Sequence, residues 1–188
     1  MPANDPKKTT PTPAQPTQPA PPGVRGQPAG GSDGDAHDLR ELFVFRAGGR
    51  LFAVYREEVE ATAANLRPAP LPFAPPAVLG VVPLRGRSRT ALDPLKLFAP
   101  GATADTSHRL FVALAGDEQL ALACDEEAES FTVSPAEVTR PAVSDAADAD
   151  STPARGHVER GGATVTLLDP SRLFEAAMRG TDRRRRRA

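Results

Sequence analysis

The sequence is poor in several residue types that particular classes of protein need. Its 188 residues include one cysteine, no tryptophan and one tyrosine. A single cysteine excludes an intramolecular disulfide and fits a reducing compartment. No apolar run reaches the roughly 18 residues that a membrane span requires, and the first 20 residues lack the apolar stretch of a signal peptide. We therefore expect a soluble cytoplasmic protein.

The same scarcity argues against catalysis. The three histidines are scattered: His37 lies in a proline-rich segment, and His108 and His157 stand at the starts of predicted strands, where an exposed histidine is common. Cys124 ends the alternating stretch LALAC, which predicts a buried, inert thiol. One tyrosine leaves few surfaces on which bases could stack, and no glycine stretch has the spacing of a phosphate-binding loop. We expect no catalytic residue and no cofactor.

Carboxylates gather in the stretch DEEAE, residues 125–129. At the end of a predicted strand, such a cluster is usually a solvated loop. As a metal site it would need further ligands, and the spacing of a calcium-binding loop is absent. We therefore predict no metal site.

Proline and charge are abundant, and both are unevenly distributed. Residues 1–38 hold nine prolines in their first 28 positions and almost no large apolar side chains, so we expect a disordered tail, idle or acting as a tether. The central residues 39–178 carry a net charge of −5. Residues 179–188 form a basic tail with a net charge of +5. Five of its arginines are consecutive: Arg183, Arg184, Arg185, Arg186 and Arg187.

The arginine run allows three interpretations. It is a solvated tail, or it associates weakly with an anionic membrane surface or with nucleic acid. Five charges near a membrane give enrichment rather than firm anchoring. A module that uses its body only to position this tail is one alternative function for the chain.

Three pairs of short apolar runs flank glycine-containing turns, which predicts three β-hairpins. The stretches are LFVFRAGGRLFAV, RLFVALAGDEQLALAC and GHVERGGATVTLL. Between them, REEVEATAANL predicts a brief helix with Val59 and Ala63 on one face. PPAVLGVV predicts an apolar turn that leads into a strand.

One motif occurs twice, 76 residues apart. TALDPLKLF begins at Thr90 and TLLDPSRLF begins at Thr166, with six of nine positions identical. The aspartates predict helix caps and the prolines predict first helical positions, at Asp93 and Pro94 and again at Asp169 and Pro170. We expect Leu97, Phe98, Leu173 and Phe174 to anchor these helices. Because a hairpin also recurs at an offset of 68 residues, we infer two similar β-rich halves, each a small closed barrel, packed as one unit.

The stretch LPFAPPAVLGVVPLRGRSRTALDPLKLF, residues 71–98, resembles the CheW family of chemosensory coupling proteins. The family pattern is an LP, a turn of helix, a G-V-x-x-L-R-G strand and a strand ending in L-D. The flanking stretches LFVFRAGGRLFAVYREEVEA, LALACDEEAES and RGHVERGGATVTLLDPSRLF resemble the family's opening, middle and closing segments. The resemblance covers residues 39–178.

The resemblance implies a mostly β fold of two intertwined, SH3-like five-stranded barrels with short connecting helices and a groove between the barrels. It implies a non-catalytic adaptor that couples chemoreceptor tips to the regulatory domain of a CheA-type histidine kinase. Such an adaptor is a monomer outside the array and clusters with receptors in the cytoplasm. Val59, Gly80, Arg85 and Gly86 match positions that the family uses near its partners. The other reading is structural, with Gly80 and Gly86 in turns and Arg85 capping a barrel.

The chain departs from the family pattern at five positions. Arg56 stands where the family has an aliphatic residue, and Pro83 stands where it has an asparagine. Arg87 and Arg89 lie in a strand that is normally apolar, and Glu127 replaces a normally apolar residue. We expect the two basic residues of this strand, Arg87 and Arg89, and the acidic Glu127 to lie on contact surfaces and to alter the choice of partner, since charge changes at interfaces shift specificity more than fold. The alternative is that the chain no longer couples a receptor to a kinase.

Overall fold

The computed structural model describes residues 38–99, 101–102, 107–116, 118–140 and 152–185, with side chains up to Arg179. The predicted disordered tail, except Asp38, lies outside these residues. The described elements are β1 (Arg40–Ala47), β2 (Arg50–Tyr55), η1 (Arg56–Glu58), β3 (Val59–Ala64), β4 (Val78–Leu84), β5 (Arg87–Leu92), α1 (Pro94–Phe98), β6 (Leu110–Leu114), β7 (Leu120–Cys124), β8 (Glu126–Glu127), β9 (Phe131–Val133), η2 (Pro135–Glu137), β10 (Ala154–Arg160), β11 (Ala163–Leu168) and α3 (Pro170–Arg185).

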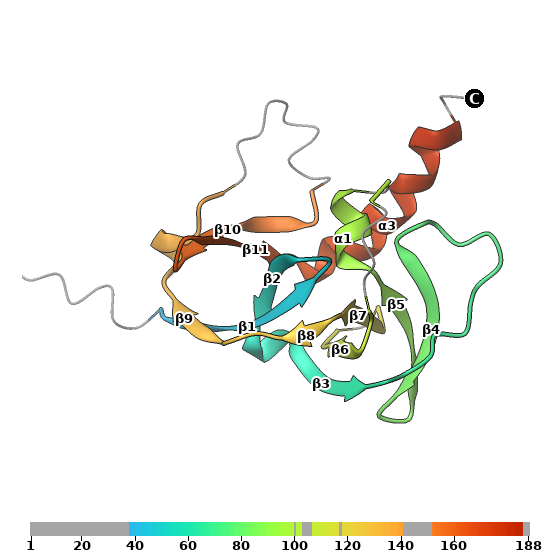
Figure 1. The fold of residues 1–188 in the computed structure, drawn as a ribbon, viewed down its shortest axis with the longest axis horizontal. Helices are drawn as coiled ribbons and strands as arrows, with labels where there is room; N and C mark the ends of the chain where they lie inside the picture. The colour runs from blue at the N-terminus through green and yellow to red at the C-terminus, as the bar shows by residue number, and fades with distance from the viewer. Residues whose placement is uncertain (1–37, 100, 103–106, 117, 141–151, 186–188) are drawn as a thin grey trace, which may run out of the picture. The chain divides into compact units, whose positions relative to one another are not determined.

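The strands form two sheets (Figure 1). One has the order β10-β11-β2-β1-β8, with β9 also paired to β1, and the other has the order β3-β6-β7-β5-β4. We call the first barrel A and the second barrel B, because an isolated bridge links the two ends of each sheet: Thr139 with His157 in barrel A, and Ala69 with Val81 in barrel B. The expected mostly β fold with few helices is confirmed.

The two halves of the sequence exchange their hairpins. The first hairpin, β1–β2, pairs through β2 with β11 of the second half, in parallel. The second-half hairpin, β6–β7, pairs through β7 with β5 of the first half, also in parallel. Each barrel therefore needs both halves of the chain, and the repeat in the sequence marks interlocked halves rather than two independent units.

All three predicted hairpins are confirmed. The turns at Gly48-Gly49 and Gly161-Gly162 have positive φ at both residues, which is what a two-residue type I′ turn requires. A similar turn at Arg85-Gly86 joins β4 to β5.

The helix predicted for residues 56–66 is wrong. Only the single turn η1 is helical, and the chain then continues as β3, which pairs with β6 from Val59 to Ala64. Glu57, Glu58 and Glu60 suggested the start of a helix. In the structure this segment is a strand, and its Ala61 packs in the interior of barrel B. Here tertiary pairing outweighs a weak local helical preference.

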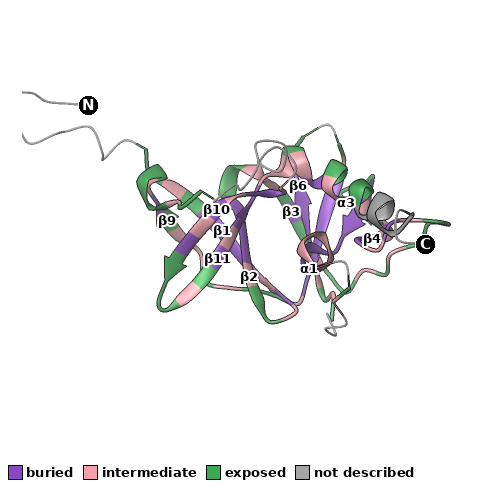
Figure 2. Cartoon of the chain, turned by 90° about the horizontal axis from the view of Figure 1, so that it is seen from above, coloured by how far each residue is buried: buried purple, intermediate pink, exposed green. Residues whose placement is uncertain are grey.

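The core has three parts, because the central strands are buried on both faces. In β1, Phe43 and Phe45 face a cluster shared by the two barrels, whereas Leu42 and Val44 face the interior of barrel A. Figure 2 shows buried residues along the strands and exposed residues mainly at their turns. The interior of barrel B is built largely from small residues: Ala61, Ala91, Ala113, Ala121 and Ala123, with Val82, Leu84 and Phe111.

The two predicted caps are confirmed. Asp93 accepts hydrogen bonds from the backbone N–H groups of Leu95 and Lys96 at the start of α1, and Asp169 accepts one from Ser171 at the start of α3. Of the predicted anchors, Leu97 and Phe98 pack against the shared core and Leu173 is fully buried. Phe174 is 42% exposed, so its anchoring role is wrong; Ala177, one turn after Leu173, is buried instead.

Candidate partner-binding site

The β4–β5 turn presents the expected contact residues Arg85 and Gly86 to solvent. Both are exposed, and φ is 50° at Arg85 and 72° at Gly86. Pro83 and Arg87, two of the departures from the family pattern, flank the turn and are exposed as well. The turn is therefore a basic projection at the end of a hairpin, and a guanidinium there can offer two parallel donors to a carboxylate.

The other two expected contact residues lie apart from this turn. Val59 is half-buried at the start of β3, opposite Leu114. Gly80 is buried, with a φ of 138°, and the carbonyl of Ala69 in the same chain occupies the space above it. The close backbone approach expected at Gly80 is thus made by this chain and closes barrel B. The four residues do not form one continuous patch.

Arg89 is not on a surface, contrary to the expectation that the charged departures lie on contact surfaces. Its side chain has no exposed area, because it lies on the same face of β5 as Ala91 and points into barrel B. The alanines around this interior leave the volume that a guanidinium needs. The period of two along the strand puts Arg89 on the same face as the apolar Ala91, and this was the signal in the sequence that could have placed it inside.

The buried guanidinium of Arg89 binds three parts of barrel B. Its Nη1 donates to the carbonyl of Leu114 at 2.7 Å and to that of Leu120 at 3.5 Å, and its Nη2 pairs with the carboxylate of Glu60. Leu114 ends β6 and Leu120 begins β7, so Arg89 holds both ends of the β6–β7 turn. Nε of Arg89 has no hydrogen-bond partner among the described residues.

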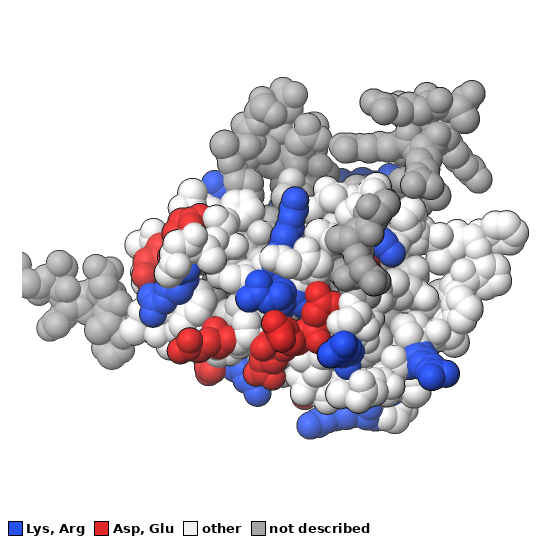
Figure 3. All heavy atoms as spheres, in the orientation of Figure 1, with Lys and Arg blue, Asp and Glu red and all other residues white. Residues whose placement is uncertain are grey.

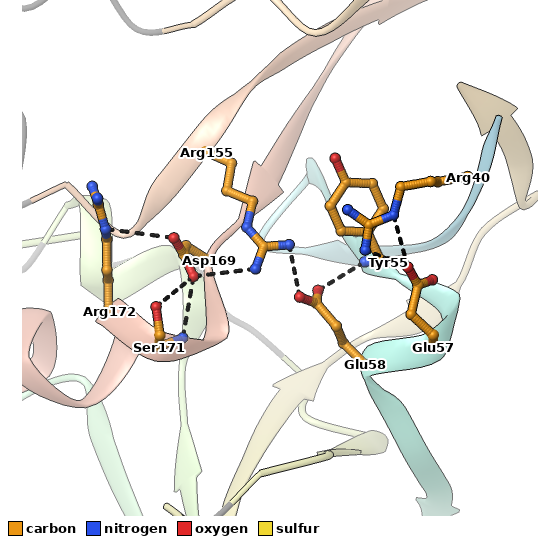
Figure 4. A network of polar contacts seen from close by, with 8 residues as sticks. All are labelled: Arg40, Tyr55, Glu57, Glu58, Arg155, Asp169, Ser171 and Arg172. Carbon is orange, nitrogen blue, oxygen red and sulfur yellow. Dashed lines mark hydrogen bonds and ion pairs between the residues drawn. The ribbon is translucent and has the colours of Figure 1, made fainter. Parts of the chain in front are cut away.

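A second ion-pair network ties η1 to β10 and to the start of α3 (Figure 4). Arg155 Nη1 lies 2.7 Å from Glu58 Oε1, and its Nη2 lies 3.3 Å from Asp169 Oδ1. Glu58 also accepts a hydrogen bond from the backbone N–H of Tyr55, whose ring lies 5.0 Å from the Arg155 guanidinium. Because η1 is where the chain passes from barrel A to barrel B, the network fixes one barrel against the other. Arg155 carried no signal in the sequence.

A pocket of about 430 Å³ lies beside this network. The β6–β7 turn forms one wall, and Glu58, Arg155 and the start of α3 form the other. The apolar lining residues are Leu114, Ala115, Leu120 and Pro170, and Glu58, Glu118, Gln119, Arg155 and Ser171 add polar groups. Burial and the charge of Glu175 raise the pKa of Glu118 above its ordinary value. The pocket is thus lined by apolar and polar side chains together, and two of the polar ones, Glu58 and Glu118, are carboxylates.

Both capping aspartates have a lowered pKa, and each owes it to different neighbours. Burial acts to raise the pKa of Asp93, but the hydrogen bond from His108, the charges of His108 and Lys96 and a backbone N–H hold it below its ordinary value. The pKa of Asp169 is lowered in the same way by Ser171 and Arg155, against the opposite effect of burial. His108 is half-buried against Asp93, at 3.3 Å, rather than exposed as expected.

The predicted buried thiol is confirmed: Cys124 has no exposed area, and burial first, then Asp125 and Glu127, raise its pKa to about 12. In the neighbouring acidic stretch, Asp125 accepts hydrogen bonds from the backbone N–H groups of Gly48 and Ser107. Glu126 pairs with Arg46, and on the face in Figure 3 acidic and basic side chains adjoin each other. The described residues contain no group of three or more potential metal ligands.

The basic tail is only partly described. The backbone of α3 continues through Arg185, so Arg183, Arg184 and Arg185 extend a helix, whereas Arg186 and Arg187 lie outside the described residues. The association of this tail with membranes or nucleic acid stays a prediction. No helix in the described part of the chain is long and apolar enough to cross a membrane.

Comparisons with known proteins agree with this architecture. Residues 41–178 match the family described as "CheW-like domain". The chain is 29% identical over 141 residues to a chemotaxis protein CheW of Rhizobium meliloti (strain 1021), covering 74% of this chain and 90% of that protein. It also matches the crystal structure of the scaffolding protein TtCheW from Thermoanaerobacter tengcongensis with a TM-score of 0.59 and 18% identity, covering 72% of this chain and 92% of that one. The chain therefore belongs to the CheW-like domain family, whose members are non-catalytic scaffolds of chemotactic signalling.

Proposed function

We propose that this chain couples chemoreceptors to the regulatory domain of a CheA-type histidine kinase, as a scaffold in a cytoplasmic receptor array. The exposed Arg85-Gly86 turn carries the proposal, because a positively charged hairpin end is suited to a carboxylate or carbonyl on a partner. The kinase domain would contact this end of barrel B. A receptor tip helix would lie in the region between the barrels.

The departures from the family pattern favour a particular set of partners. Pro83 and Arg87 add rigidity and a second positive charge beside Arg85, and Glu127 adds an exposed carboxylate on β8. A partner that carries acidic residues opposite the β4–β5 turn would be favoured, and a basic one would be rejected. Arg89 does not contribute to this selection, because it is buried.

Calorimetric titration of the full chain with the regulatory domain of the CheA-type kinase from the same organism tests the proposal. We expect micromolar binding that Arg85→Glu weakens at least about tenfold, which corresponds to about 1.4 kcal/mol. Arg50→Glu is the matched control, because Arg50 is exposed at the β1–β2 turn of barrel A. Absence of binding, or equal loss with both variants, would contradict the proposed contact.

A further inference from the structure

Helix α3 presents an apolar strip to solvent beside its buried face. Leu173 and Ala177 are buried in the core that the two barrels share, whereas Phe174 is 42% exposed and Met178 is 49% exposed. Residues four positions apart in a helix lie one above the other on the same face, so Phe174 and Met178 form one continuous strip beside the buried one. Two large apolar side chains thus lie at the surface directly before the basic tail.

The basic tail continues this helix. The backbone of α3 extends through Arg185, which lies about 10 Å beyond Met178 along the helix axis. These two positions are about two helical turns apart, so position 185 falls on the same face as the apolar strip. Figure 1 shows the C-terminal turns of α3 extending beyond the two sheets. The apolar strip and the positive charge therefore lie end to end on a helix that projects from the body of the protein.

Positive charge by itself does not select one kind of polyanion. The arginine run is suited to the phosphates of nucleic acid and to those of lipids, and the net charge of −5 on residues 39–178 opposes the approach to either surface. A membrane differs in offering an apolar layer just below its phosphates, which a nucleic-acid duplex lacks. Exposed Phe and Met side chains leave water when they enter that layer, so Phe174 and Met178 favour a lipid surface.

We propose that α3 docks on an anionic lipid bilayer, with Phe174 and Met178 inserted at the boundary between headgroups and acyl chains and the arginine run among the lipid phosphates. Leu173 and Ala177 hold the neighbouring face of the helix to the core, so one strip alone can enter the bilayer and the insertion is shallow. The contact is therefore weak, reversible and sensitive to salt. It uses no residue of the β4–β5 turn, and it does not rest on the proposed adaptor role.

Co-sedimentation of the full chain with lipid vesicles tests this proposal. The vesicles contain equal parts of phosphatidylcholine and anionic phosphatidylglycerol, and vesicles of phosphatidylcholine alone are the comparison. We expect the chain to bind the anionic vesicles at low salt, to bind them less as salt is added, and to leave the neutral vesicles largely unbound.

The apolar strip is tested by the double variant Phe174→Ser/Met178→Ser. We expect its partitioning into anionic vesicles to fall by about tenfold or more, because the apolar contribution is lost while every arginine remains. Both side chains are exposed, so the fold should tolerate the changes. Leu39→Ser is the matched control: Leu39 is an apolar residue that is 56% exposed and lies outside α3, so vesicle binding should be unchanged.

The sequence contains no tryptophan, which allows insertion to be measured directly. Phe174→Trp places a single indole on the apolar strip. Its fluorescence should shift to shorter wavelength when anionic vesicles are added, and lipids with brominated acyl chains should quench it, because the indole moves from water into the interface of the bilayer. Leu39→Trp should show neither effect.

Three results would overturn the proposal: no binding to anionic vesicles at low salt, equal binding by the wild type and the double variant, or fluorescence of Phe174→Trp that vesicles do not change. Tighter binding to a DNA duplex of random sequence, unaffected by the double variant, would also overturn it and would assign the tail to nucleic acid. The result is separable from the proposed adaptor role. The vesicles carry no receptor or kinase, and the double variant leaves Arg85 intact, so kinase binding should be unchanged in the same preparation.

Discussion

A Cβ atom on Gly80 would lie 2.1 Å from the carbonyl oxygen of Ala69. The equivalent glycine of the other barrel, Gly156, would place a Cβ 2.5 Å from Val138 Cγ1 and 2.7 Å from the carbonyl oxygen of Thr139. The two glycines are 76 residues apart, which is the offset of the repeated Asp-Pro motif. Each lies next to the bridge that closes its barrel, so in both barrels a missing side chain permits closure.

Gly80→Ala should therefore destabilise the protein strongly. Alanine at a φ of 138° is strained, and its methyl group overlaps the backbone of Ala69, which cannot move aside without breaking two hydrogen bonds. We expect the free energy of unfolding to fall by about 2–4 kcal/mol, measured by urea denaturation. Gly162→Ala is the control: φ is 78° there and the surrounding space is open, so strain alone should cost about 1 kcal/mol. Equal losses would argue against the overlap.

The Arg89–Glu60 pair should respond unequally to loss of its two partners. Glu60→Leu leaves a guanidinium with no exposed area and no countercharge, whereas Arg89→Leu leaves a carboxylate that is 33% exposed and can be hydrated. We expect Glu60→Leu to cost about 3–5 kcal/mol of unfolding free energy and Arg89→Leu clearly less. The double variant should cost less than the sum of the two. Chemical denaturation of all three variants measures this coupling, and strict additivity would contradict it.

Asp93 should make stability depend on acid pH. Its pKa in the folded protein lies below the ordinary value, so its contribution is complete above about pH 5 and is lost as the pH falls through the folded pKa. In that range the unfolded chain takes up the proton first, which favours unfolding. Asp93→Asn should flatten the acid limb of unfolding free energy against pH, measured by denaturation between neutral and acid pH. The exposed Glu126→Gln is the control and should leave the limb steep.

Cys124 should be unreactive while the protein is folded. The thiol has no exposed area, its pKa is raised to about 12, and its Sγ lies 3.4 Å from the carbonyl of Leu110. Ellman's reagent at about pH 8 should label it at the rate of unfolding and rapidly in concentrated denaturant, because only the exposed thiolate reacts. Rapid labelling under native conditions would show that strands β6 and β7 separate locally.

Local features of this protein were readable from its sequence, because they depend on neighbouring residues. Each Gly-Gly pair can adopt the two positive φ angles that a type I′ hairpin turn requires. In Asp93-Pro94 and Asp169-Pro170, the aspartate caps a helix and the proline occupies its first position. The resemblance placed residues 39–178 in a family, and the family match at 41–178 agrees.

Other features depend on segments that are far apart in the chain, and the sequence alone did not show them. Residues 59–64 have weak helical preference, and pairing with β6 makes them a strand. Arg89 looked like a surface charge, but the small alanines of other strands give it a buried site with Glu60 and two carbonyls.

The sequence by itself contains the Asp-Pro motif twice, and this repeat is enough to show that the chain has two similar halves. Which hairpin joins which barrel was decided only by the tertiary structure. A strand such as β1, apolar on both faces, can pack in either barrel, and the choice depends on closing both barrels around one shared core.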